Sequence, residues 1–484
     1  MSQTLQLVIV PSPGMGHLIP LIEFAKHLVH FHDYFNVTCI IPTIGSPPDA
    51  MKASVLALPS NINHIFLPPI SFEEDRSYHS EVGNVVLISL AMTRSLPSLR
   101  HILKSLIETN TRVVALLVDS FGTAAFDVAN EFHLSSYLFF TSNAMALSTL
   151  FYLPKLDKMV SCEFRDLPEP VKIPGCVPVH GRDIGELFQD RKSDTYELFL
   201  NMARRFGLAK GIVLNTFIDI EAGALKALME EDEEYSSGVR PPIYPIGPMV
   251  RAGSSDQGRE FDCLTWLDNQ PSGSVLYVSF GSGGTLSHNQ LIELAFGLEL
   301  SQYRFIWVVR SPNDESANAA FFKVQSEKDP FGFLPEGFLE RTKQRGLVIS
   351  SWAPQIEVLG HGSTGGFLTH CGWNSILESV VYGVPMIAWP LFAEQKINAV
   401  MLNEDVKVAL RPEVHKEDGG LVIREEIAKV VKKLMEGEEG NKVRKRMREN
   451  LKDAASKALM EDGASRKALL KLALEWKNQT AGKY

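Results

Sequence analysis

The chain has 484 residues, of which 45% are hydrophobic, and a formal net charge of −9 at pH 7. A single hydrophobic core stops growing near roughly 250–300 residues, so this length excludes one ordinary core and predicts two domains of similar size. The negative charge argues against nucleic acid or an anionic membrane as the partner, because both are bound through patches of Lys and Arg. We therefore expect small-molecule ligands. A monomer is a separate expectation.

The cysteines and the first residues bear on the compartment. Five cysteines are few, odd in number and scattered, which favours a reducing compartment over a disulfide framework. Residues 1–10 contain no Lys or Arg, and the apolar run LQLVIV begins already at Leu5. A signal peptide would instead begin with positively charged residues. No stretch of about 18 apolar residues is present, as a membrane span would require. These features predict a cytoplasmic protein without membrane contact.

Short apolar runs alternate with longer segments of helical period along the chain. In the first half these runs are LQLVIV, VTCII, VVALLVD, YLFF and GIVLN, and in the second half VLYVSF, FIWVV, LVI, GFLTH and PMIAW. Alternation of strand and helix is typical of parallel sheets covered by helices on both faces. We predict an α/β protein with two doubly wound, Rossmann-like domains that face each other across a cleft.

A segment dense in Pro, Gly and Ser separates the two halves. Linkers between domains have this composition, so we predict an N-terminal domain at 1–247, a linker at 248–262 and a C-terminal domain at 263–484. Whether the last helix packs back on the N-terminal domain is left open. The polar residues 311–330 predict a long exposed loop, to which the sequence assigns no role.

His17 follows the first predicted strand, in the turn PSPGMGH. Open parallel sheets bind ligands at this edge, and a neutral imidazole is well suited to take a proton from an attacking hydroxyl near pH 7. Asp119 ends the strand VVALLVD, where its carboxylate can accept the other ring N–H and stabilise the imidazolium. A lone His in a turn would be interpreted as a capping or packing residue. Together with Asp119, we expect His17 to be a general base.

Residues 352–395 carry polar and aromatic groups at fixed intervals. The flat face of Trp352 can stack on a base. His370 can face a phosphate across Gly372, whose missing side chain lets the backbone come close. This order of groups is what a nucleotide sugar would need along its length.

A helix predicted to open at Asn374 and Ser375 continues this pattern. Free N–H groups and the positive end of the helix dipole attract a diphosphate. Glu378 lies four residues after Asn374 and so on the same helical face. One carboxylate there can accept hydrogen bonds from both hydroxyls of a ribose.

Residues 352–395 closely resemble the signature box of the plant family 1 UDP-glycosyltransferases. The resemblance extends to nearly the whole chain, and QDRKSDTYELFLNMARR and GIVLNTFIDIEAGALKAL look like the branch that glucosylates hydroquinone, other small phenols and monolignols. It implies a GT-B fold and an N-terminal acceptor domain with a C-terminal UDP-sugar domain. The donor residues it implies are Ser282, Trp352, Ala353, Gln355, His370, Trp373, Asn374, Ser375, Glu378, Glu394 and Gln395.

By this resemblance, uracil stacks on Trp352, the uridine contacts Gln355, and the sugar hydroxyls are bound by Glu394 and Gln395. Most relatives carry Asp where this chain has Glu394, so the longer arm moves the carboxylate. Gln395 is similar to the glucose-using form of the box, since relatives that use galactose tend to carry His there. Trp373 lies near the sugar or packs in the core, and both interpretations stay open.

These parts predict the reaction. His17 deprotonates a hydroxyl, and its oxygen attacks C1 of UDP-glucose from the face opposite UDP, which inverts the configuration to a β-glucoside. The charge that develops on UDP needs stabilisation. The chain has no Asp-x-Asp pair for a metal, so we expect His370, the helix start and Ser282 to supply it. UDP-glucose is then a co-substrate, and neither a metal nor another cofactor is expected.

Three other functions fit parts of the pattern. The support for an NAD-dependent oxidoreductase is weak, because neither Gly-rich turn has the spacing G-x-G-x-x-G. A protein that binds nucleotide sugars without catalysis would have no use for His17 and Asp119. A zinc site at His361, His370 and Cys371 matches no standard ligand spacing.

The acceptor site is the part least marked by motifs. Phe121, two residues after Asp119, can wall a flat aromatic ring, with Leu147, Leu150 and Phe392 as weaker candidates that core packing also explains. An apolar pocket would select acceptors by shape. We expect hydroquinone first, then indoxyl, coniferyl alcohol and chlorinated phenols. The sequence leaves open whether aromatic amines are also substrates and how strict the preference for glucose is.

Overall fold

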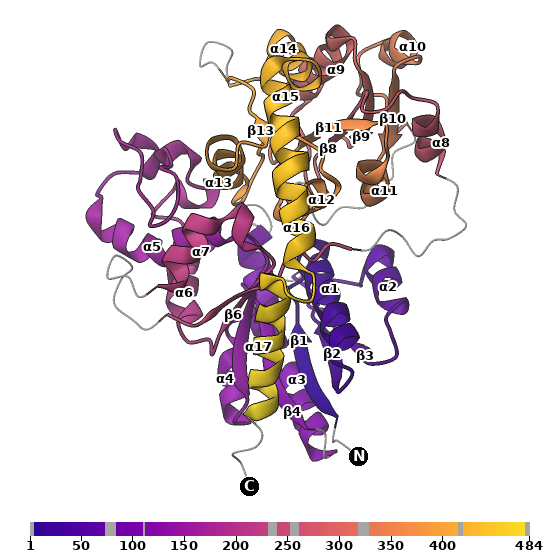
Figure 1. Ribbon diagram of the computed structural model, residues 1–484. Helices are drawn as coiled ribbons and strands as arrows, with labels where there is room; N and C mark the ends of the chain where they lie inside the picture. Colours follow the sequence, from indigo (N-terminus) through magenta and orange to yellow (C-terminus); the bar gives the residue numbers. More distant parts are fainter. Residues whose placement is uncertain are drawn as a thin grey trace. The chain divides into compact units, whose positions relative to one another are not determined.

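The computed structural model describes residues 4–72, 84–109, 112–230, 240–251, 261–317, 329–414 and 420–479 (Figure 1). The chain divides into two compact units. Unit 1 consists of Met1–Gly181, Leu187–Met249 and Lys457–Tyr484, and unit 2 of Arg182–Glu186 and Val250–Ser456. The last helix belongs to unit 1, a placement that the sequence left open, and residues 182–186 belong to unit 2. Most of the predicted linker and of the predicted 311–330 loop lies outside the described residues.

Unit 1 is built on a seven-stranded parallel sheet in the order β3-β2-β1-β4-β5-β6-β7. The strands are β1 (Leu5–Val10), β2 (Phe35–Ile41), β3 (Ile62–Phe66), β4 (Val113–Asp119), β5 (Ser135–Phe140), β6 (Ile212–Leu214) and β7 (Ile243–Pro245). β1 and β4 are neighbours, with Val10 opposite Val118. The strand order reverses between them, and doubly wound sheets bind ligands beyond the carboxyl ends of strands at such a switch point.

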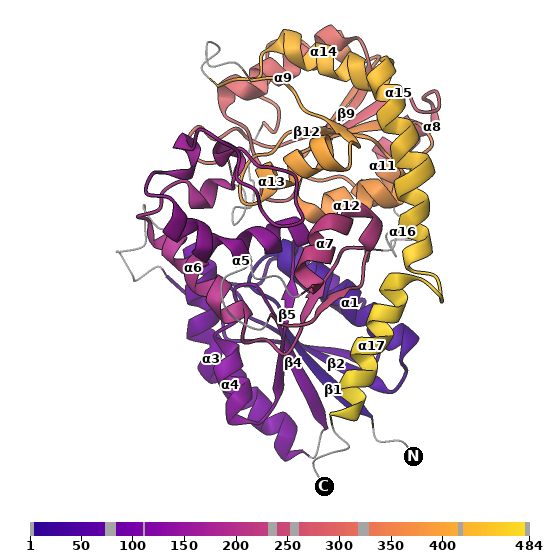
Figure 2. The ribbon, with the colours of Figure 1, turned by 60° about the vertical axis from the view of Figure 1, so that its left-hand side comes forward.

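Helices cover this sheet, and the last helix of the chain is one of them. They are α1 (Met15–Phe31), α2 (Asp49–Leu56), α3 (Asn84–Glu108), α4 (Ala125–Glu131), α5 (Ala144–Met159), α6 (Asp194–Phe206), α7 (Ala222–Met229) and α17 (Ala464–Asn478), with short 3-10 turns at Phe164–Asp166 and Ile218–Ile220. In both views α17, in yellow, runs along the strands of unit 1 (Figures 1 and 2). Trp476 of α17 is fully buried and packs edge-on against Phe24 and Phe35. This apolar face explains why α17 belongs to unit 1.

Unit 2 has a six-stranded parallel sheet in the order β10-β9-β8-β11-β12-β13. The strands are β8 (Val275–Ser279), β9 (Arg304–Val309), β10 (Gly346–Ser350), β11 (Thr364–Thr369), β12 (Met386–Ala388) and β13 (Ala409–Leu410). Its switch point lies between β8 and β11, where Ser279 is opposite Thr369. Both units are therefore doubly wound, which confirms the predicted α/β class.

The helices of unit 2 pack on this sheet in the same manner. They are α8 (Asp262–Asp268), α9 (His288–Ser301), α10 (Phe338–Thr342), α11 (Gln355–Gly360), α12 (Trp373–Tyr382), α13 (Gln395–Val400), α14 (Arg424–Met435) and α15 (Glu438–Lys445), with π-helical turns at Met401–Asp405 and Arg446–Lys452. Three elements each contain a point where the chain passes between units: the 3-10 turns Gly181–Asp183 and Glu186–Phe188 and the helix α16 (Asp453–Ala458). α9 and α14 lie side by side (Figure 2), with Gly297 directly against Ile427.

All ten predicted strand segments coincide with observed strands, whereas β3, β7 and β13 were not predicted. All three missed strands lie at the edge of a sheet. The five cysteines are free thiols. Within the described parts of the chain, no helix is both long and apolar enough to cross a membrane.

Candidate active site

His17 and Asp119 come together at the switch point of unit 1. Gly14 precedes α1 with φ 128°, a conformation that favours glycine, and thereby places His17 in the first turn. Asp119 is the last residue of β4. Nδ1 of His17 lies 2.8 Å from Oδ2 of Asp119, and the two side chains are 15% and 0% exposed. The distance is that of a hydrogen bond but the ring nitrogen is not aligned with the oxygen; such bonds often align only when substrate is bound.

Three further donors hold the carboxylate of Asp119. Oδ2 accepts a hydrogen bond from the backbone N–H of Ser12 at 2.8 Å. Oδ1 accepts bonds from the Ser12 hydroxyl and from the backbone N–H of Phe121, the latter at 3.3 Å. A buried carboxylate is tolerated only when donors of this kind replace water. Ser12 was not predicted from the sequence; the signal for it is a polar residue just beyond a fully buried strand.

Phe121 is the predicted acceptor residue in contact with His17. The two rings lie edge to face, with centroids 5.5 Å apart, and Phe199 packs edge-on against Phe121 at 6.4 Å. Leu147 and Leu150 lie on α5 and are buried, Leu147 completely. Phe392 is half-buried in unit 2, between β12 and α13. Only Phe121 among these four is therefore linked to His17 by a ring contact.

His370 lies at the switch point of unit 2, directly after β11. Two glycines enclose its ring: a Cβ added to Gly281 or to Gly372 would lie less than 3.0 Å from Nε2. Gly281 comes from the turn after β8 and Gly372 from the residue before α12. The absence of a side chain at both positions is what leaves room for the imidazole.

The environment of His370 keeps its ring neutral. Burial lowers the pKa of His370 to about 4. Nδ1 is buried and has no hydrogen-bond partner among the described residues. A neutral imidazole has one donor and one acceptor nitrogen, so His370 can bind a phosphate through a hydrogen bond but not as a cation.

The start of α12 adds backbone donors beside His370. Gly372 occupies the N-cap position with φ −65° and contributes no side-chain cap. Asn374 and Ser375 lie in the first turn of the helix, half-buried and buried respectively. The N–H groups and the dipole of a helix start attract anions, so this place suits a diphosphate.

Gln355, Ser375 and Glu378 form a hydrogen-bonded group between α11 and α12. Nε2 of Gln355 donates to Oγ of Ser375 at 2.9 Å and to Oε2 of Glu378 at 2.6 Å. Burial raises the pKa of Glu378 to about 7, and the hydrogen bond from Gln355 opposes that rise. One amide group of Gln355 thus links Ser375, which is buried, to Glu378, which is half-buried like Gln355 itself.

The other predicted donor residues differ in how far their side chains are exposed to solvent. Trp352 is 59% exposed although it contacts Phe261, whereas the predicted residues Ala353 and Trp373 are buried. Ser282 is exposed in the turn after β8, and Glu394 is half-buried just before α13. Gln395 is buried, and its Oε1 accepts backbone N–H bonds at 2.9 and 3.0 Å from the loop that precedes it. An exposed indole suits base stacking, while the carbonyl of Gln395 is already engaged.

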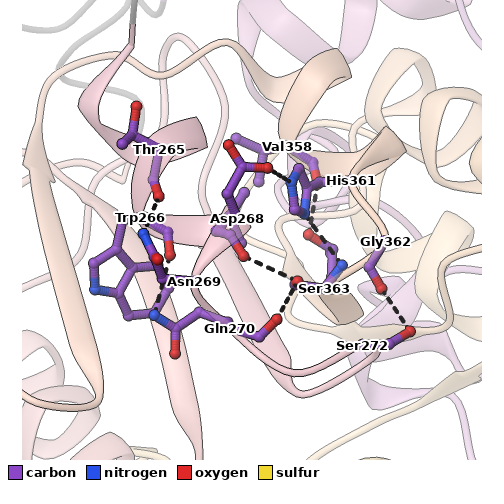
Figure 3. Close-up of polar contacts among 12 residues, drawn as sticks. Thr265, Trp266, Asp268, Asn269, Gln270, Ser272, Val358, His361, Gly362 and Ser363 are labelled. Atoms are coloured by element: carbon purple, nitrogen blue, oxygen red, sulfur yellow. Dashed lines mark hydrogen bonds and ion pairs between the residues drawn. The ribbon is translucent and has the colours of Figure 1, made fainter.

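His361 has a structural role (Figure 3). Its Nε2 lies 3.1 Å from Oδ1 of Asp268, and its Nδ1 accepts the backbone N–H of Ser363 at 3.2 Å. The ring thus joins α8 to the turn before β11. No group of three or more His, Cys, Asp or Glu residues in the described ranges could hold a metal ion, so His361, His370 and Cys371 do not form the zinc site considered above.

Comparison with known proteins identifies relatives along the whole chain. Residues 242–438 match the family described as UDP-glucoronosyl and UDP-glucosyl transferase. Hydroquinone glucosyltransferase of Rauvolfia serpentina is 58% identical over 479 residues, 99% of each chain. The structure of Phytolacca americana UGT2 complexed with UDP-2fluoro-glucose and pterostilbene is 51% identical with a TM-score of 0.86, over 98% of this chain and 99% of that chain. A Polygonum tinctorium UDP-glucosyltransferase capable of glucosylating indoxyl, solved with 3,4-dichloroaniline, is 48% identical with a TM-score of 0.89, over 99% and 100%.

Two doubly wound parallel sheets, together with this likeness to solved glycosyltransferases, define the GT-B fold class. The chain belongs to the plant family 1 UDP-glycosyltransferases and resembles the branch that contains the hydroquinone glucosyltransferase. It is therefore a transferase that uses a UDP-sugar, and the predicted family, fold and enzyme class are confirmed.

Proposed function

We propose that this enzyme transfers glucose from UDP-glucose to the hydroxyl of a small aromatic compound and forms a β-glucoside with inversion. His17 takes the proton of the acceptor hydroxyl, and Asp119 orients the ring and stabilises the imidazolium. The observation that carries this proposal is the 2.8 Å approach of Nδ1 of His17 to a fully buried carboxylate that three other donors hold in place.

The acceptor class is supported by Phe121 and by the relatives. The edge contact between Phe121 and His17 offers an aromatic surface beside the base. Among the relatives, one is a hydroquinone glucosyltransferase and another is capable of glucosylating indoxyl. We propose hydroquinone as the leading acceptor, followed by indoxyl, monolignols and chlorinated phenols.

On the donor side, we propose that Trp352 stacks on uracil, that Gln355 contacts the uridine, and that Glu378 binds the ribose. The diphosphate would be bound by His370 and the start of α12, and the sugar by Glu394 and Gln395. The departing UDP carries negative charge, which the N–H groups of a helix start, the neutral imidazole and the Ser282 hydroxyl can stabilise without a metal. We further propose a cytoplasmic monomer, which sedimentation velocity and a fluorescent fusion would check.

The direct test is turnover of the purified enzyme with UDP-glucose and hydroquinone. We expect release of UDP and a product whose anomeric proton has the coupling of a β-glucoside. His17→Ala is expected to lower kcat by roughly 10²- to 10⁴-fold, the contribution of a general base, while UDP-glucose binds as before. His30→Ala, on the exposed face of the same helix, is the control and should retain full turnover. Full turnover of His17→Ala, or an α-glucoside product, would contradict the mechanism.

A further inference from the structure

We propose that Ser12 is a positioning residue, whose hydroxyl holds the carboxylate of Asp119 in the orientation that faces His17. This inference rests on the proposed function, because it assigns Ser12 an effect that passes through Asp119. Ser12 was not among the residues expected from the sequence motifs. It lies two residues after β1 and is itself buried.

The two oxygens of Asp119 have different partners. Oδ2, the oxygen nearest His17, also accepts the backbone N–H of Ser12 at 2.8 Å. Oδ1 accepts the Ser12 hydroxyl and, at 3.3 Å, the backbone N–H of Phe121. Ser12 therefore contacts both oxygens, one through its main chain and one through its side chain. Two contacts from one residue fix the plane of the carboxylate.

The hydroxyl is the part of this arrangement that a substitution can remove. The main-chain bond from Ser12 survives any replacement except Pro, and so does the longer bond from Phe121. Within the described residues, Ser12 is the only side chain besides His17 that lies within hydrogen-bond or ion-pair distance of the Asp119 carboxylate. Without it, Oδ1 would keep only its longest bond, and the carboxylate could rotate away from the ring nitrogen.

The orientation of this carboxylate matters because it selects the state of the imidazole. A carboxylate in front of Nδ1 favours the tautomer with the proton on Nδ1 and leaves Nε2 as the basic nitrogen. A rotated carboxylate no longer favours that tautomer. We therefore expect a loss in turnover rather than in donor binding.

Ser12→Ala is the first variant to measure. We expect kcat to fall roughly 10- to 100-fold, the range for loss of a hydrogen bond to a charged group, with KM for UDP-glucose and the melting temperature close to those of the parent. Ser136→Ala is the matched control, since Ser136 is a buried serine of the same sheet whose Oγ has no hydrogen-bond partner in the described residues. That variant should retain full turnover.

A double-mutant cycle separates positioning from any contact of Ser12 with substrate. In an Asp119→Ala background, Ser12→Ala should have no further effect on kcat. An unchanged kcat in Ser12→Ala, or an equal loss in both backgrounds, would overturn the role of Ser12 and leave the His17–Asp119 mechanism standing. Full turnover of Asp119→Ala alone would overturn both. If Ser12→Ala does not fold, Ser12→Cys serves instead: its thiol is a weak donor, and the same loss of kcat is expected, with a parental kcat again counting against the role.

Discussion

The two sheets place polar residues at equivalent positions, but the chemistry at the two positions differs. In unit 1 the β1–β4 switch point carries Asp119, a buried carboxylate that accepts three hydrogen bonds and lies 2.8 Å from the ring of His17. In unit 2 the β8–β11 switch point carries His370, whose buried Nδ1 has no partner among the described residues. One site thus supplies the hydrogen bonds of its charged group from within the protein. The other leaves polar atoms available to a ligand.

This difference follows from what each group has to do. A carboxylate that stabilises an imidazolium must carry its charge throughout the reaction, and a buried charge requires donors from the protein. A group that binds a diphosphate can instead be neutral, because the ligand brings the charge. Burial favours the neutral form in unit 2: it lowers the pKa of His370 to about 4 and raises the pKa of Glu378 to about 7.

The largest effect on turnover is expected from removing the charge of Asp119. Asp119→Asn keeps the shape of the side chain but presents an NH2 group to donors, and it removes the charge opposite the imidazolium. We expect kcat to fall on the order of 10³-fold, with UDP-glucose binding unchanged. Steady-state kinetics and calorimetric titration measure the two quantities. A parallel loss of UDP-glucose binding would show that the two sites are not chemically separate.

In the predicted donor site, Gly372→Ala tests whether the position of the His370 ring depends on the absence of a side chain at residue 372. The φ of −65° and ψ of 137° at Gly372 are allowed for alanine, so the added Cβ acts only by its overlap with Nε2. We expect UDP affinity to fall roughly 10-fold or more, about 1.4 kcal/mol of binding free energy, by calorimetry.

Two controls accompany this variant. Gly362→Ala adds a Cβ in open space and should bind UDP like the parent. In a His370→Ala background, Gly372→Ala should cost nothing more, because the ring that it displaces is absent. An equal cost in both backgrounds would assign the effect to the backbone instead of to His370.

A smaller effect is expected from pH, through Glu378. If its ionised form accepts the ribose hydroxyls, protonation weakens binding, so UDP-glucose affinity should rise with pH up to the pKa of about 7 and level off above it. For a single group of that pKa, the gain is about tenfold between pH 6 and pH 8. His370 adds no step in this range, since its pKa is about 4. Glu378→Gln should bind more weakly but without the rise, and a rise that persists in this variant would assign the titration to another group.

We expect no effect on turnover from the removal of metal ions. If the helix start and His370 stabilise the departing UDP, EDTA should leave kcat unchanged in an assay with UDP-glucose and hydroquinone. Magnesium added after EDTA should also have no effect. Strong inhibition that magnesium relieves would mean that a metal carries part of the charge on UDP.

The central strands could be predicted from sequence, and three edge strands could not. A strand buried on both faces is a continuous apolar run, as in β1 and β4. β3 carries two exposed polar residues, β7 contains a proline, and β13 has two residues. Edge strands have fewer neighbours that demand apolar side chains, so their sequences carry a weaker signal.

The candidate site divides in the same way. Residues 352–395 lie close together in the sequence, and the chemistry of their side chains, their order and their resemblance to a family signature box indicated a nucleotide-sugar site. Ser12 and Asp119 are 107 positions apart, and nothing local to Ser12 indicates its contact with that carboxylate. The complete burial of Leu147 on α5 could not be predicted from the sequence either, because an apolar helix residue can face a pocket or the core.

The sequence by itself determined the α/β class, the family and the positions of the chemical groups, because strand periodicity and motif spacing are properties of neighbouring residues. Only the tertiary structure decided which strands adjoin and that α17 returns to unit 1. It also decided that Asp119 accepts three hydrogen bonds from Ser12 and Phe121, while His370 and Glu378 are shifted toward neutrality. The physical reason is that strand order and burial depend on contacts between distant segments. Those contacts set the donors and the solvent around each group, and with them its charge.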